Sequence, residues 1–271
     1  VSYSRSPGPE FIGKLKDAGV VCMPTVGLTK HATKAVELGA DVITVQGGEG
    51  GGHTGAVPTT LLIPQVIDAV GDKVPVVAAG GFKDGRGLLA AMAWGADGIA
   101  MGTRFLMTEE SPVPRETLQR YIDCGDPAAI VRSTAIDGMP QRMILNEVLS
   151  DLEKAGALRK LLIAFRNGLA FRKHTGASML SLVRSALAMS RDDSMTAAQA
   201  IMSANAPMII QKAMVDGDPS HGVLPSGQVA GVIDRLLSCE ELVQSIVTEA
   251  EQRLALLALR NDTSVNQGVA S

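Results

Sequence analysis

Short apolar runs alternate with helix-like segments along the first 104 residues, and this alternation constrains the fold more than any other feature. The runs are rich in β-branched residues, which is typical of strands buried on both faces of a parallel sheet. The predicted strands are Val1–Ser4, Val20–Val26, Asp41–Gln46, Val74–Ala79 and Gly98–Arg104, and the predicted helices between them are Pro9–Ala18, Thr29–Leu38, Thr59–Val70 and Asp84–Trp94. Such repetition predicts right-handed βαβ units.

The number of strands points to part of a larger architecture. After Arg104 the pattern predicts mainly helices, at Arg115–Asp123, Gln141–Ala155, Met195–Ala204 and Cys239–Leu259, with Ile130–Arg132 as the one candidate strand. A TIM-type (β/α)8 barrel has eight strands, so we expect an α/β barrel that lacks roughly its first three βα units, on the order of 80–100 residues. An open, doubly wound sheet of five strands is the alternative.

The expected regions follow from this pattern. They are the later part of the barrel (residues 1–135), a helical cap (136–215), a loop with closing helices (216–260) and a frayed polar tail (261–271).

Composition excludes several classes of function. The net charge of −3 gives no basic footprint for nucleic acid. No window approaches 18 uninterrupted apolar residues, so no transmembrane helix is expected. The three cysteines, Cys22, Cys124 and Cys239, fit neither a disulfide framework nor a zinc spacing. We therefore expect a cytoplasmic protein without a bound metal.

The stretch Gln46-Gly-Gly-Glu-Gly-Gly-Gly-His53 is the strongest candidate site. It begins where a predicted strand ends, which is where barrels hold their active sites. Its five glycines, among them Gly47 and Gly52, let the backbone approach a ligand closely. Gln46 can hydrogen-bond a planar heterocycle, and His53 can act as an acid or a base near neutral pH. A flexible glycine loop with an exposed histidine is the simpler alternative.

Two further strand ends carry glycine. Gly80 and Gly81 follow one predicted strand, and Gly102 and Thr103 end the next one, 22 residues later. Backbone N–H groups at Gly81, Gly102 and Thr103 could hold a phosphate without any lysine. Glycine also ends strands for packing reasons, so it is the regular spacing of the two pairs that favours a phosphate site.

These motifs resemble those of the nitronate monooxygenase (2-nitropropane dioxygenase-like) family, which includes flavin-dependent enoyl reductases. The family motif Q-G-x-E-A-G-G-H is similar to Gln46–His53, with Gly50 in place of the usual alanine. Its A-x-G-G and G-T-R-F signatures are similar to Ala78–Gly81 and Gly102–Phe105, and its P-x-G-Q to Pro225–Gln228. The resemblance extends from about Val1 to Leu236. The family's first glycine-rich motif, with its FMN-contacting asparagine, has no counterpart, in agreement with missing early βα units.

The resemblance implies a flavin mononucleotide (FMN) enzyme. Gln46, Gly81, Gly102 and Thr103 then correspond to FMN contacts, together with Gln228, and His53 corresponds to the catalytic residue. Three reactions stay open: oxidation of a nitronate with O₂, reduction or dehydrogenation of an enone or enoyl-CoA thioester in lipid or steroid breakdown, and phosphate-ligand binding by a barrel without flavin. NAD(P)H is a candidate electron donor, and a homodimer is compatible with all three.

Other residues bear on the choice of substrate. The basic stretch Arg166–His174 could clamp the phosphates of coenzyme A through Arg172, Lys173 and His174, or be a solvated helical face. The Met-rich cap suits a bulky apolar ligand. We therefore favour an acyl thioester over a small nitroalkane. His31 and His221 are expected at the surface, and Glu49 could orient either His53 or a backbone turn.

Overall fold

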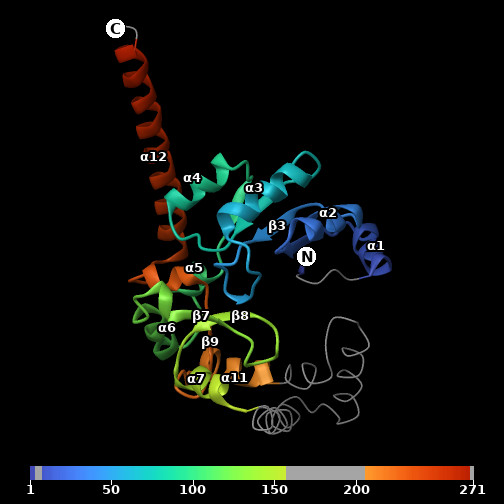
Figure 1. The fold of residues 1–271 in the computed structure, drawn as a ribbon, viewed down its shortest axis with the longest axis vertical. Coiled ribbons are helices and arrows are strands. Elements are labelled where there is room, and N and C mark those ends of the chain that lie inside the picture. The colour runs from blue at the N-terminus through green and yellow to red at the C-terminus, as the bar shows by residue number, and fades with distance from the viewer. Residues whose placement is uncertain (4–7, 157–204, 269–271) are drawn as a thin grey trace. The chain divides into compact units, whose positions relative to one another are not determined.

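The structure, a computed structural model, describes residues 1–3, 8–156 and 205–268 (Figure 1). The chain forms two compact units. The first contains residues 1–50, 54–110 and 235–271, and the second contains 51–53 and 111–234. The boundaries expected at residues 135 and 215 both fall inside the second unit.

The first unit is a parallel sheet with helices between its strands. Its strands are β1 (Ser2–Tyr3), β2 (Met23–Val26), β3 (Ile43–Gln46), β5 (Val76–Ala79) and β6 (Gly98–Ala100). Its helices are α1 (Pro9–Asp17), α2 (Thr29–Glu37), α3 (Thr59–Val70), α4 (Gly85–Ala93), α5 (Thr103–Leu106) and α12 (Cys239–Gly268). α12 packs against α4 (Figure 1).

The strand order in this sheet is β1-β2-β3-β5-β6, and every neighbouring pair is parallel. Neighbours in the sheet thus follow one another along the chain, with no reversal of the kind that a doubly wound sheet contains. This winding is that of a (β/α) barrel, which confirms the predicted fold class and removes the doubly wound alternative.

Side-chain alternation decides which face of this sheet the helices cover. Ile43 and Val45 of β3 are fully buried in the main hydrophobic core, together with Leu62, Ile63 and Val66 of α3. Successive strand residues point to opposite faces, so Thr44 and Gln46 lie on the face away from these helices. The helix-covered face supplies the core, and the other face carries the polar residues of β3.

The second unit contains an antiparallel sheet that the sequence pattern did not predict. Its strands are β4 (Gly52–His53), β7 (Ile130–Ser133), β8 (Gln141–Ile144) and β9 (Leu224–Pro225), and its helical segments are α6 (Arg115–Ile122), η1 (Pro127–Ala129), α7 (Glu147–Lys154), α11 (Asn205–Met214) and η2 (Gln228–Val232). β8 is central: it pairs with β7 along one edge and with β4 and β9 along the other.

Three predicted elements were wrong. The helix expected over Gln141–Ala155 begins with strand β8, because pairing along both edges overrides the local helix propensity of that segment. α7 starts only after Asn146, whose side chain accepts a hydrogen bond from the Leu149 N–H at 3.0 Å. The strand expected through Arg104 ends at Ala100 and is followed by α5. The expected frayed tail is part of helix α12 as far as Gly268.

Candidate functional site

Three adjacent strand ends bring the glycine motifs of the first unit to one edge of its sheet. Gln46 pairs with Ala79 at the ends of β3 and β5, and Ala79 pairs with Ala100 at the ends of β5 and β6. Carboxyl ends of neighbouring parallel strands share an edge, where barrels hold their active sites. The predicted residues at this edge are Gln46, Gly47, Gly80, Gly81, Gly102 and Thr103.

Two of these glycines are needed for packing. A Cβ atom on Gly47 would lie 2.1 Å from Oγ1 and 2.5 Å from Cα of Thr59. Gly80 has a φ of +102°, and a Cβ there would lie 3.1 Å from both Gly47 and Thr59. The loop also uses its own donors, because the N–H of Gly47 donates to the Ala79 carbonyl at 3.0 Å and that of Gly48 to the Val57 carbonyl at 2.7 Å. The first loop glycines therefore hold the loop against the sheet.

Gly81 and Gly102 differ from these packing glycines. Gly102 has an ordinary φ of −80°, and a Cβ atom there would meet nothing within 4 Å. Gly81 has a φ of +80°. Their backbone N–H groups find no acceptor among the residues that the structure describes. Two such donors at the ends of neighbouring strands are in a position to bind an anion.

Glu49 fixes the turn that follows β3. Its carboxylate accepts hydrogen bonds from the Thr59 backbone N–H at 2.9 and 3.2 Å and from the Thr59 hydroxyl. Thr59 Oγ1 also lies 3.1 Å from the Gly80 carbonyl oxygen. Of the two roles left open for Glu49, the structure supports the backbone one: the carboxylate caps the start of α3 and connects it to the edge with the glycines.

His53 belongs to a hydrogen-bonded pair that the sequence motifs did not indicate. Its Nε2 lies 2.8 Å from Oδ2 of Asp137, which is 84 residues away along the chain. The side chain of Asp137 is 3% exposed, whereas that of His53 is 53% exposed. A buried carboxylate thus orients a histidine that solvent or a ligand can reach, which is the usual arrangement of a general base and the group that orients it.

Asp137 is held as a carboxylate. Burial alone would raise its pKa, but hydrogen bonds from His53, from the Met139 backbone N–H and from the Gln141 side chain outweigh burial and lower the pKa below its usual value. The Met139 N–H lies 3.0 Å from Oδ1. Gln141 Nε2 donates to Oδ2. An ionised carboxylate only accepts hydrogen bonds, and all three partners can donate.

The segment before Gln228 lies against the loop that carries His53. A Cβ atom on Gly51 would lie 2.5 Å from the Gly227 nitrogen and 2.6 Å from the carbonyl carbon of Ser226. Gly52 has a φ of +66° with open space around it. The second unit therefore brings two of the predicted motifs together: Gly51–His53 and the Pro225–Gln228 stretch.

The other predicted residues lie either outside the described part of the chain or at its surface. Arg172, Lys173 and His174, predicted to bind an anionic substrate tail, lie outside the described residues. His31 and His221 are exposed, as expected, and His221 Nδ1 lies 2.9 Å from the exposed Asp218. Within the described part of the chain, no three potential metal ligands come together, and no helix is long and apolar enough to cross a membrane.

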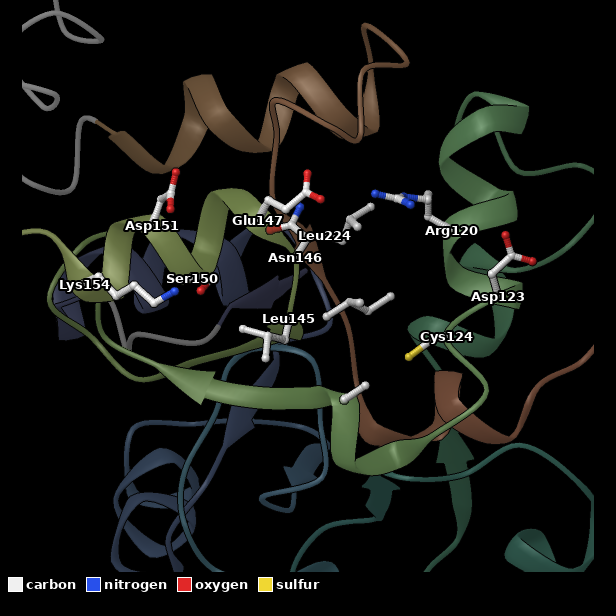
Figure 2. A pocket seen from close by; sticks show the side chains of 12 residues that line it. Arg120, Asp123, Cys124, Leu145, Asn146, Glu147, Ser150, Asp151, Lys154 and Leu224 are labelled. Carbon is white, nitrogen blue, oxygen red and sulfur yellow. The ribbon is translucent and has the colours of Figure 1, made fainter.

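A cleft of about 580 Å³ lies between α6 and α7 of the second unit (Figure 2). Arg120 and Cys124 line one wall and Glu147 and Lys154 the other, with Leu224 between them (Figure 2). Ile144 of β8 lines it too. His53 pairs with Gln141, three residues earlier on β8, so strand alternation places His53 and Ile144 on opposite faces of the sheet. The cleft is therefore separate from the His53–Asp137 pair.

Comparison with known proteins agrees with the motifs. The nitronate monooxygenase family model matches residues 2–249. The chain is 49% identical over 260 residues to a (3aS,4S,5R,7aS)-5-hydroxy-7a-methyl-1-oxo-octahydro-1H-indene-4-carboxyl-CoA dehydrogenase of Rhodococcus jostii, covering 96% of this chain and 73% of that protein.

Two solved structures are similar over nearly the whole chain. FabK from Thermotoga maritima is 27% identical with a TM-score of 0.68, over 95% of this chain and 70% of that one. A nitroalkane oxidase from Streptomyces ansochromogenes is 26% identical with a TM-score of 0.68, over 94% of this chain and 65% of that one.

Proposed function

The chain belongs to the nitronate monooxygenase family of oxidoreductases, and we propose that it is an FMN-dependent dehydrogenase of a bulky, bicyclic acyl-CoA thioester. The observation that carries the substrate class is the 49% identity over 96% of the chain to the Rhodococcus dehydrogenase, compared with 26% to the nitroalkane oxidase. The bicyclic thioester in the name of that relative agrees with the large acyl substrate that the sequence favours.

The strand-end edge of the first unit fits the phosphate of FMN. The N–H groups of Gly81 and Gly102 are donors without an acceptor among the described residues, and the space beside Gly102 that a Cβ would occupy is open. Gln46, at the end of β3, would hydrogen-bond the flavin ring, and Thr103 and Gln228 are further predicted contacts. When bound, FMN supplies the acceptor for the hydride that a dehydrogenation removes.

His53 supplies the acid–base function. Dehydrogenation removes a proton together with the hydride, and the imidazole of His53 accepts that proton from the substrate. Asp137, buried and ionised behind the ring, stabilises the imidazolium that results. NAD(P)H would serve only the reverse, reductive direction.

An anaerobic titration tests this function. The purified protein should show the absorption of oxidised flavin, and the flavin should bleach on addition of a bicyclic hydroxy-acid CoA thioester without O₂. A colourless protein that cannot be reconstituted with FMN would overturn the cofactor. A coloured protein that the thioester does not bleach would overturn the substrate class.

Nitronate oxidation is the second candidate, favoured by the family model itself and by the TM-score of 0.68 to the nitroalkane oxidase. In that reaction His53 would hydrogen-bond the nitro oxygens or remove the α-proton. O₂ uptake measured with a nitronate in the same preparation distinguishes the two: rapid uptake without bleaching by the thioester favours the nitronate.

A further inference from the structure

Asp137 is held in place independently of His53. It lies in the loop between β7 and β8, next to Ile136, which is 1% exposed and packs in a core cluster with Met143 and Leu149. Gly138, the next residue, turns the chain with a φ of +80°. Asp137 Oδ1 accepts the Met139 N–H, which closes a local turn at the aspartate. The carboxylate is thus fixed by backbone and core before the histidine contacts it.

The position of His53 is set by the sheet. His53 of β4 lies opposite Gln141 of β8, and residues directly opposite in an antiparallel pair point to the same face. Gln141 Nε2 and His53 Nε2 both bond Oδ2 of Asp137. One carboxylate oxygen therefore takes two donors that come from adjacent strands, and the imidazole ring is fixed through its Nε2 side.

This geometry selects a tautomer. A carboxylate has no proton to give, so the nitrogen that faces it must carry one. In neutral His53 the proton then sits on Nε2, and the lone pair sits on Nδ1. A histidine held in this way has one defined basic atom, whereas a free imidazole has two that exchange.

From this arrangement we infer that Asp137 is a positioning residue that fixes the ring of His53 as the Nε2–H tautomer. Gln141 assists by holding Oδ2 in line with the ring. The tautomer follows from the geometry alone, and its effect on turnover rests on the proposed function.

Nitrogen NMR of the resting protein tests the tautomer without any activity. In protein labelled with ¹⁵N at histidine, the His53 signals are assigned by their loss in His53→Asn. We expect the neutral ring to carry its proton on Nε2 and none on Nδ1. A wild-type spectrum with the proton on Nδ1 overturns the inference, whether or not the protein oxidises any thioester.

Asp137→Asn tests the positioning role. The amide can donate to Nε2, which moves the proton of the neutral ring to Nδ1 and reverses the tautomer. We expect kcat to fall roughly 10²–10⁴-fold with little change in KM, and the ¹⁵N signals of His53 to show the other tautomer. Unchanged kcat in a variant whose tautomer has switched overturns the positioning role of Asp137.

Asp218→Asn is the matched control, because His221 Nδ1 also lies 2.9 Å from its aspartate, at the surface. It should leave kcat and the His53 signals unchanged. If Asp137→Asn does not fold, Gln141→Met serves instead: it keeps the carboxylate, and we expect His53 to remain the Nε2–H tautomer with a smaller loss of kcat. A switched tautomer in that variant would show that Asp137 does not fix the ring.

Discussion

The two units of the chain present chemistry in different ways. The first unit offers backbone hydrogen-bond donors. Gly81 and Gly102 lie at the ends of parallel strands, and their N–H groups find no acceptor among the described residues. The second unit offers side chains, since His53 of β4 contacts Asp137 in the loop that leads into the neighbouring strand β8. A backbone site needs only glycine at the right place in a βα unit, so a short motif shows it. A side-chain pair needs two positions that the fold brings together, and no short motif contains both.

Among the variants, His53→Asn should have the largest effect on turnover. An effect on cofactor binding instead would contradict the division between a backbone site in the first unit and a side-chain site in the second. The variant removes the proton acceptor, and we expect turnover to fall roughly 10²–10⁴-fold with unchanged flavin content. The measurements are stopped-flow flavin reduction and the flavin-to-protein absorbance ratio. Loss of flavin with normal turnover per bound flavin would mean that His53 is a cofactor contact.

Gly47→Ala should mainly affect folding. The added Cβ would lie within 2.7 Å of the nitrogen and Cα of Thr59, backbone atoms that cannot rotate away. We expect a loss of roughly 3 kcal/mol in the free energy of unfolding, the upper end for overpacking. Denaturant unfolding of the flavin-free protein measures it. Wild-type stability with lost flavin would instead assign Gly47 a direct role in binding.

The division between backbone and side chains also explains what the sequence could predict. Strands β2, β3 and β5 and helix α3 were predicted because their apolar runs and periodicities are local. The glycine motifs at the strand ends were found for the same reason. β8 was missed because the segment Gln141–Ile144 is extended only through its pairing with β7, β4 and β9.

A local signal for the missed hairpin was nevertheless present. Asp137-Gly138 lies in the seven-residue segment between the runs Ile130–Ser133 and Gln141–Ile144, and an Asp-Gly step between two such runs favours a turn. It would have placed β7 beside β8. The contact of Asp137 with His53, 84 residues apart along the chain, would still have been missing, because it depends on the pairing of the two-residue strand β4 with β8.

Asp137→Asn should also reveal how the stability of the second unit depends on pH. The folded-state pKa of Asp137 is lowered from its ordinary value of 3.8, so its contribution to stability is complete above that value and is lost as the pH falls through the folded-state pKa. We expect the variant to be less stable than the wild type by roughly 1–3 kcal/mol at pH 7. Below pH 3.8 the difference should shrink.

Urea unfolding at several pH values measures this difference. Asp218→Asn is the control, since that carboxylate is exposed and its bond to His221 should not change the urea midpoint. A stability gap for Asp137→Asn that stays constant between pH 7 and acid would show that the charge of Asp137 does not stabilise the fold.

Gly102→Ala should have the smallest effect on the fold and gives the sharpest test of the backbone site. The added Cβ meets nothing within 4 Å, and the φ of −80° suits alanine, so unfolding should change by less than about 0.5 kcal/mol. If the phosphate of FMN lies against this backbone, the methyl group fills its space, and we expect the Kd for FMN to rise about tenfold, or ~1.4 kcal/mol.

Gly98→Ala is the matched control. A Cβ on Gly98 is equally unhindered, but Gly98 stands at the opposite end of β6, away from the strand-end edge. Equal FMN affinity in both variants would remove Gly102 from the site, whereas weaker binding in Gly102→Ala alone would assign the open space beside it to the cofactor.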